Sequence, residues 1–183
     1  MRITNIELTG YKRLSLTHIH YLSMTMTEKV IFILGTNGSG KSSLLKELSP
    51  LPAHSAQFEK DGSKCIEIDH LGFHYILKSD FSTNKHTLIK QQRSETGDIV
   101  FEDNLNPGGT QTVQRELVKK EFGITQELHD LFTGQIKFHR MSVAERRKWF
   151  TLFSQSDYTY ALAIYQKFKD SLRDAQANLK MTQ

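Results

Sequence analysis

The sequence predicts an α/β fold in which a glycine-rich loop joins a hydrophobic strand to an amphipathic helix. Residues 30–34 are continuously apolar, as in a strand that is buried on both faces. Residues 35–42 then supply three glycines, which favour a tight turn. Residues 42–48 place leucines on one side of a helix, which ends before Pro50. We therefore expect a parallel strand–loop–helix core.

The bulk composition fits one globular domain with an appendage. The chain has 183 residues, of which 38% are hydrophobic and 24% charged. It shows neither the run of about 20 apolar residues that spans a bilayer nor a signal peptide, and its lone Cys65 excludes an internal disulfide. We expect a cytoplasmic protein. A net charge of +4 permits nucleic acid as a partner without requiring it.

Strand patterns surround the central loop. Residues 2–8 predict a strand, and residues 14–22 a second extended stretch. The 53–106 region predicts antiparallel β-structure. Its segments 65–69 and 73–77 form one expected hairpin, and 86–91 and 98–102 the next.

The remaining sequence has helical spacing. Residues 111–122 and 126–132 predict helices, and Ser142 with Glu145 forms a capping box for a helix that ends near Phe153. Apolar residues then recur at intervals of three or four, as in a coiled-coil seam: Ala161, Ile164, Phe168, Leu172, Ala175 and Leu179. We expect the chain to stop inside a longer coiled coil.

The central loop has the pattern G-x-x-x-x-G-K-S from Gly35 to Ser42. Glycines let backbone N–H groups turn toward phosphate oxygens, and the following helix start adds positive potential. Lys41 supplies a cation for the β- and γ-phosphates, and the Ser42 hydroxyl suits Mg²⁺. The loop therefore predicts binding of a nucleoside triphosphate, taken as ATP with magnesium, without naming the reaction.

Three features together resemble the SMC-like ATPases. Residues 37–45 (NGSGKSSLL) are similar to that family's form of the loop, and residues 6–14 (IELTGYKRL) to its first strand and aromatic–basic turn. Residues 133–136 (TGQI), followed by 141–150, look like its glutamine loop and Glu-Arg-Arg helix. The nearest match is the SbcC type, the ATPase subunit of the SbcC–SbcD exonuclease and its phage counterparts. This resemblance implies a place in the host cytoplasm if the protein is phage-encoded.

The resemblance implies a P-loop NTPase fold of the ABC-ATPase type. Residues 1–157 would form the N-terminal half of the ATPase head. This half comprises the phosphate loop 35–42, the β-region 53–106 and a helical glutamine-loop segment 110–157. Residues 158–183 would begin the coiled coil.

The resemblance also assigns roles to residues. Gln135 would reach the magnesium ion and the attacking water, and Ser42 would be the other metal ligand. Lys12 matches a basic position that contacts nucleotide, although arginine is common there, and Asn37 is expected near the γ-phosphate. The full expected nucleotide-binding set is Lys12, Gly35, Asn37, Gly38, Ser39, Gly40, Lys41, Ser42 and Ser43.

Two of the family's motifs are absent from the sequence. There is no buried run ending in Asp-Glu, and no S-G-G-type signature helix. In the family, both lie in the C-terminal half. We therefore expect this chain alone to bind nucleotide weakly or not at all, and to be nearly inactive in hydrolysis. Its expected partners are that C-terminal half, a second head joined through ATP, an SbcD-like metallo-nuclease and double-stranded DNA, with no membrane.

Two alternatives stay open. One is an SMC-like ATPase that organises DNA without a nuclease. The other is a non-DNA P-loop enzyme, such as a small-molecule kinase, which would turn over without a further half. The pairs His18 with His20 and His70 with His74 lack partners at metal-ligand spacing, so we expect the histidines to be packed or solvated.

Overall fold

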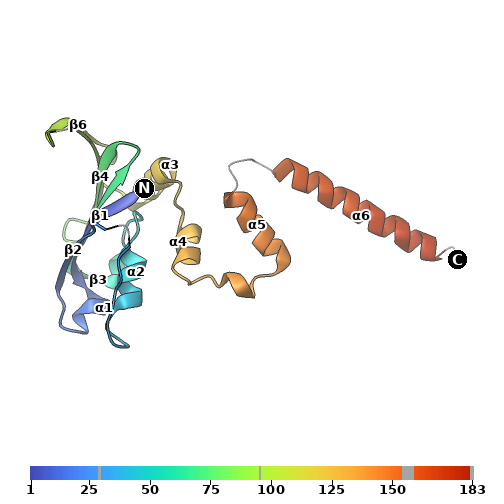
Figure 1. Cartoon of the computed structure of the whole chain (residues 1–183), viewed down its shortest axis with the longest axis horizontal. Helices are drawn as coiled ribbons and strands as arrows, with labels where there is room; N and C mark the ends of the chain where they lie inside the picture. The colour runs from blue at the N-terminus through green and yellow to red at the C-terminus, as the bar shows by residue number, and fades with distance from the viewer. Residues whose placement is uncertain (29, 95, 154–158, 182–183) are drawn as a thin grey trace. The chain divides into compact units, whose positions relative to one another are not determined.

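A computed structural model describes residues 1–28, 30–94, 96–153 and 159–181 (Figure 1). The chain forms two compact units, Met1–Ile136 and Lys137–Gln183. Each is considered by itself below. Within these described ranges, no helix is long and apolar enough to cross a membrane.

The first unit is organised around a six-stranded sheet in the order β2-β1-β3-β4-β5-β6. Every pair of neighbouring strands in it is antiparallel. The parallel core expected from the sequence is therefore wrong for the described part of the chain. The strands are β1 (Arg2–Tyr11), β2 (Tyr21–Thr25), β3 (Phe58–His70), β4 (Phe73–Asp80), β5 (Lys85–Arg93) and β6 (Ile99–Asn104).

One face of the sheet carries the hydrophobic core. Alternate residues point to the same face of a strand, so Ile6 and Leu8 of β1 lie on the same side as Ile66 and Ile68 of β3. Helix α2 (Lys41–Glu47) and helix α3 (Gln111–Phe122) contribute to this core through Leu44 and Val118. The sheet therefore packs the helix of the phosphate loop directly against its buried face.

The two expected hairpins are confirmed. The β3–β4 turn uses Leu71 and Gly72 at φ of 50° and 80°, the left-handed values that a two-residue hairpin requires. Gln91 of β5 pairs with Glu102 of β6. All six residues of β6 are exposed, and β6 forms one edge of the sheet.

Residues 30–34 differ most from expectation. They form no strand in the structure, and Phe32 and Leu34 are 81% and 88% exposed. An apolar run becomes a buried strand only when neighbouring strands pair with its backbone on both sides. Among the described residues no strand does so, and the prediction of a buried strand here is wrong.

The predicted extended stretch at 14–22 is also wrong at its beginning. Helix α1 (Lys12–Ser15) forms a single turn that buries Leu14, and β2 follows only after a turn in which His18 has φ 61°. His18 and His20 therefore precede the strand and do not share one of its faces.

The helix predictions are largely confirmed. A short turn, η1 (Ser55–Gln57), leads into β3, and Gly123 ends α3 in the left-handed conformation that suits glycine at this position. Helix α4 (Gln126–Phe132) follows, capped by Thr125. These segments complete the first unit.

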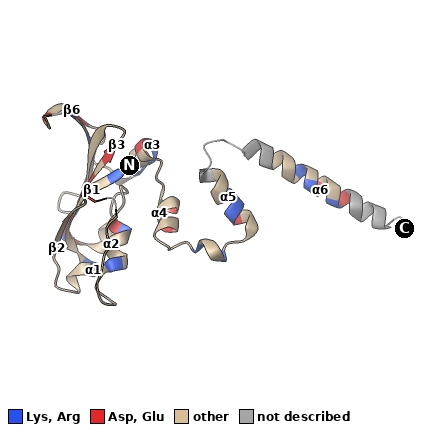
Figure 2. Cartoon of the chain, in the orientation of Figure 1, with Lys and Arg blue, Asp and Glu red and all other residues tan. Residues whose placement is uncertain are grey.

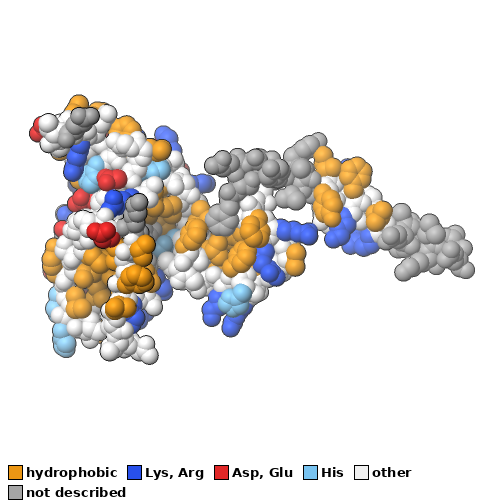
Figure 3. Space-filling view, viewed as in Figure 1, with side chains coloured by type: hydrophobic (Ala, Val, Ile, Leu, Met, Phe, Trp, Pro, Cys, Tyr) orange, Lys and Arg blue, Asp and Glu red, His pale blue; other side chains and the backbone are white. Residues whose placement is uncertain are grey.

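The second unit contains η2 (Phe138–Arg140), α5 (Val143–Phe153) and α6 (Thr159–Met181). Ser142 and Glu145 exchange the two hydrogen bonds of a capping box, as predicted. On α6, the side chains of Ile164, Phe168 and Leu172 are exposed by 37%, 70% and 61%, and Figure 3 shows apolar side chains on its surface. The expected boundary at 157/158 and the side chains of Ala161, Ala175 and Leu179 lie outside what the structure describes.

Candidate nucleotide site

The phosphate-loop sequence forms a compact turn that leads straight into α2. The Ser39 amide donates to the Thr36 carbonyl at 3.3 Å, and Gly38 has φ 86°. Gly40 immediately precedes the helix at φ 87°, a conformation that residues with a Cβ rarely adopt. The local geometry therefore explains the positions of these two glycines.

Close packing explains two of the glycines as well. A Cβ added at Gly35 would lie 2.6 Å from the Ser39 hydroxyl oxygen, and one at Gly40 would lie 2.6 Å from a methyl carbon of Leu14. Both distances are shorter than any normal contact. The loop curls back on itself at Gly35 and is pressed against α1 at Gly40.

The lysine of the loop is bound to the loop's own backbone. Its ammonium nitrogen lies 2.7 Å from both the Gly35 and the Thr36 carbonyl oxygens. Lys41 and Glu47 are the first and last residues of α2, and Figure 2 shows basic and acidic residues along this helix. A phosphate that takes up the Lys41 ammonium must therefore replace two carbonyl acceptors.

A cavity of about 310 Å³ opens beside the loop. Seven consecutive residues of the loop and helix start line it, from Asn37 to Ser43, together with Arg13 and Leu16 from the α1 region. The structure thus brings most of the predicted nucleotide-binding residues together. Gly35 stands just outside this lining, where its carbonyl holds Lys41.

Lys12, the predicted basic contact, is not among the residues that line this cavity. Its ammonium nitrogen donates to the Ala56 carbonyl oxygen at 3.1 Å, which ties α1 to η1. Its role toward nucleotide stays a prediction. The adjacent Arg13 was missed, because sequence alone does not say which of two neighbouring cations faces the loop.

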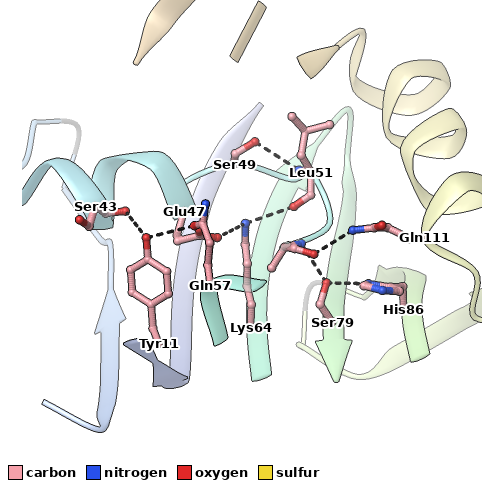
Figure 4. A network of polar contacts seen from close by, with 11 residues as sticks. Tyr11, Ser43, Glu47, Ser49, Leu51, Gln57, Lys64, Ser79, His86 and Gln111 are labelled. Carbon is pink, nitrogen blue, oxygen red and sulfur yellow. Dashed lines mark hydrogen bonds and ion pairs between the residues drawn. The ribbon is translucent and has the colours of Figure 1, made fainter. Parts of the chain in front are cut away.

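A polar network lies between α2 and the sheet (Figure 4). Lys64 of β3 and Glu47 of α2 form a buried ion pair at 3.3 Å, with 4% and 8% of their side chains exposed. Lys64 also donates to the Leu51 carbonyl oxygen. Burial lowers the Lys64 pKa, and the Glu47 carboxylate opposes that shift.

Further polar contacts extend from this ion pair toward Tyr11 at the end of β1 and toward strands β4 and β5. Burial and the Glu47 charge raise the Tyr11 pKa to about 12, and its hydroxyl lies 3.5 Å from the Ser43 carbonyl oxygen. On the other side, Ser79 bonds to His86 and to the Ala53 amide, and Gln111 donates to the Ala53 carbonyl. Helix α2 is therefore held to the sheet by charges and hydrogen bonds as well as by Leu44.

Gln135, the predicted catalytic and metal-binding glutamine, lies elsewhere. It lines a second cavity of about 380 Å³ with Lys46 and Glu47, at the end of α2 remote from Ser42. Its amide nitrogen donates to Asp130 at 3.2 Å and to Thr133 at 3.4 Å. The structure does not bring Gln135 to Ser42, so their joint binding of magnesium stays a prediction.

The histidines show no metal centre in the described part of the chain, where no group of three or more His, Cys, Asp or Glu side chains could hold a metal ion. His74 is packed between two carboxylates, with its Nδ1 2.8 Å from Asp69 and its Nε2 3.2 Å from Glu67. These contacts account for its buried position.

Comparison with known proteins identifies the family. No curated protein sequence matches the chain. Residues 19–152 match the family model described as ABC transporter, a range that covers the phosphate loop, the β-region and most of the glutamine-loop segment. This match spans more than half of the chain, and the loop geometry agrees with it. The chain therefore belongs to the ABC-type family of ATP-binding ATPases.

Proposed function

We propose that this chain is the ATP-binding half of an SMC-like ATPase subunit of the SbcC type. In that role it clamps double-stranded DNA and regulates a partner metallo-nuclease during double-strand break repair or recombination. The order of motifs supports the proposal: an aromatic–basic turn, the phosphate loop, a glutamine loop and a helix with a coiled-coil stripe follow one another. Such a protein works in the cytoplasm.

One observation carries the proposal furthest. The residues that line the loop cavity include two cations and several hydroxyl groups but no carboxylate. Hydrolysis of a triphosphate needs groups that orient the attacking water and complete the metal site, and carboxylates often supply them. We propose that these groups come from a C-terminal half of the same ATPase and from a second head across the nucleotide.

Two exposed apolar surfaces are consistent with a site that other protein segments complete. Phe32 and Leu34, just before the phosphate loop, are exposed, as are Ile164, Phe168 and Leu172 on α6 (Figure 3). Exposed apolar surfaces of this kind mark places where other protein docks. We propose that strands of the C-terminal half cover residues 30–34 and that a returning helix covers the α6 stripe.

The residues present fit ATP and Mg²⁺. Lys41 and the loop amides suit the phosphates, and the hydroxyl of Ser42 suits magnesium, with Gln135 as the second proposed ligand. Magnesium would neutralise charge on the phosphates as the γ-phosphoryl group passes to water and ADP leaves. Because Gln135 stands apart from Ser42, we propose that the glutamine-loop segment moves when nucleotide binds.

The test uses the natural full-length protein with duplex DNA. We expect magnesium-dependent ATP hydrolysis that DNA stimulates, co-purification of a metallo-nuclease, and loss of both hydrolysis and DNA processing in Lys41→Ala. Lys60→Ala removes the same charge from an exposed position on β3 and serves as the matched control.

Each alternative gives a different result. DNA-stimulated hydrolysis with no associated nuclease would favour a DNA-organising SMC-like ATPase. Rapid turnover of a small acceptor by the 183-residue chain alone would favour a P-loop kinase. Normal DNA processing by Lys41→Ala would refute the proposal altogether.

A further inference from the structure

The cavity beside the phosphate loop contains two cationic side chains, Arg13 and Lys41. Its other lining residues are glycine, serine, asparagine and leucine, so no anion among them compensates these charges. A cavity with this lining favours an anionic ligand and disfavours a neutral one.

The two cations differ in how their charges are engaged. The Lys41 ammonium already donates to the carbonyl oxygens of Gly35 and Thr36. The Arg13 guanidinium is exposed and makes no hydrogen bond or ion pair with any residue that the structure describes. Arg13 is therefore the cation of this cavity whose donors are unoccupied.

The backbone position of Arg13 is fixed by its neighbours in the chain. Leu14 is buried and packs so closely on Gly40 that a Cβ there would lie 2.6 Å from its methyl carbon. The Tyr11 hydroxyl approaches the Ser43 carbonyl oxygen at 3.5 Å. Contacts on both sides of Arg13 thus hold the α1 turn against the loop, while Lys12 bonds to Ala56.

We propose that Arg13 is a second phosphate-binding cation of this site, whose guanidinium binds oxygens of the bound triphosphate while Lys12 holds the α1 turn in place. This inference rests on the proposed function only in taking ATP as the ligand. A guanidinium offers a planar fork of N–H donors that can hold two phosphate oxygens at once.

A consequence for ligand selectivity follows. Arg13 strengthens binding in proportion to the charge it meets, so it favours ATP over ADP and contributes little for adenosine. Lys41 must first leave two carbonyl oxygens, whereas Arg13 binds without breaking any hydrogen bond to the described protein. Arg13 therefore contributes to the salt dependence of ATP binding.

The experiment measures binding of Mg·ATP, ADP and adenosine to the natural full-length protein by titration calorimetry at several salt concentrations. The variants are Arg13→Ala, Arg13→Lys, Lys12→Ala and Lys41→Ala. Lys60→Ala, on an exposed position of β3, is the charge-matched control. Circular dichroism confirms that each variant is folded.

We expect Arg13→Ala to weaken ATP binding by roughly tenfold, because one charge-assisted contact is lost. Its affinity for adenosine should stay unchanged, and the salt dependence of ATP binding should become shallower. Arg13→Lys should fall between Arg13→Ala and the natural protein, and Lys60→Ala should match the natural protein.

The outcomes separate the two proposals. If the natural protein binds ATP and Lys41→Ala does not, but Arg13→Ala matches Lys60→Ala, the role of Arg13 is refuted and ATP binding stands. A larger loss in Lys12→Ala than in Arg13→Ala would also refute it. If the natural protein binds no ATP at all, the proposed function fails first.

Discussion

Apolar residues are buried in the inner strands of the sheet but exposed in the segment that leads into the phosphate loop. Strands β1 and β3 bury Ile6 and Ile66 to 0% and 1% exposure, because each strand is paired on both sides and these two side chains lie on the face that packs against α2 and α3. Phe32 and Leu34 are as apolar but remain exposed, with no described strand beside them. Whether an apolar segment is buried therefore depends on the strands and helices that pack against it. In the sheet, those partners are other elements of the first unit.

The comparison indicates that stability and nucleotide chemistry are built from different parts of this unit. The sheet, α2 and α3 form the hydrophobic core. The residues that line the cavity beside the phosphate loop are mostly exposed or half-buried. Four experiments can break or sharpen this division, and they follow in order of expected size.

The largest effect is expected from Lys64→Met. This change leaves the Glu47 carboxylate buried without its partner, which costs about 3–5 kcal/mol of unfolding free energy. Urea denaturation followed by circular dichroism measures it. The double variant Lys64→Met with Glu47→Leu should recover most of the loss, because no unpaired charge then remains. A single variant as stable as the natural chain would contradict the buried pair.

A matched pair of leucines tests the comparison directly. Leu88 of β5 is fully buried, so Leu88→Ala should lower the free energy of unfolding by about 3 kcal/mol. Leu34 is 88% exposed, so Leu34→Ala should change it by less than about 0.5 kcal/mol. Urea denaturation measures the free energy of unfolding of both variants. Equal losses would show that residues 30–34 are packed like the sheet.

A matched pair of glycines tests the loop. Gly40→Ala combines a positive φ with a collision against Leu14, and should cost about 1–3 kcal/mol. Gly72 has φ 80° with nothing within 4 Å of an added Cβ, so Gly72→Ala measures the backbone strain alone. Thermal unfolding and ATP titration compare them. Loss of ATP binding is expected only for Gly40→Ala.

The smallest effect is a pH dependence of the core. Burial lowers the pKa of both His86 and His129 in the folded protein. The unfolded chain therefore binds more protons below the ordinary histidine pKa of about 6.5. The free energy of unfolding should fall as pH decreases from about 6.5 toward the lower folded values. Denaturation at several pH values should show a weaker dependence in His86→Gln, whereas Lys60→Ala should keep the natural slope.

Much of the fold could be predicted from local patterns. Alternation in 65–69 and 73–77, with Gly72 between them, was enough to place the β3–β4 hairpin. Ser142 and Glu145 predicted the start of α5. These features depend on residues close in sequence, whose geometry is set by turn and capping chemistry.

The predictions were wrong where the structure of a segment depends on residues far away in the sequence. A continuous apolar run predicts a buried strand only if partners lie beside it, and residues 30–34 carry no information about partners. The buried pair of Glu47 and Lys64 was missed, although Lys64 shares a strand face with Ile66 and Ile68. That alternation was a usable signal that Lys64 points into the core.

Most predicted site residues of the loop and the helix start line one cavity, whereas the predicted residues elsewhere do not. Residues 37–43 meet at one cavity because one short motif sets their backbone. Which of Lys12 and Arg13 faces that cavity depends on how α1 packs against Gly40. The position of Gln135 depends on the course of the chain after α4, which a four-residue motif cannot specify.

The edge strand β6 has a consequence for self-association. Its exposed Ile99, Val100 and Phe101 offer an apolar border with unpaired backbone groups, the kind of border along which separate molecules can join into extended sheets. Glu102 and Asp103 follow on the same strand. Their negative charge lies on the same border in every copy, so electrostatic repulsion opposes the joining of two copies along it.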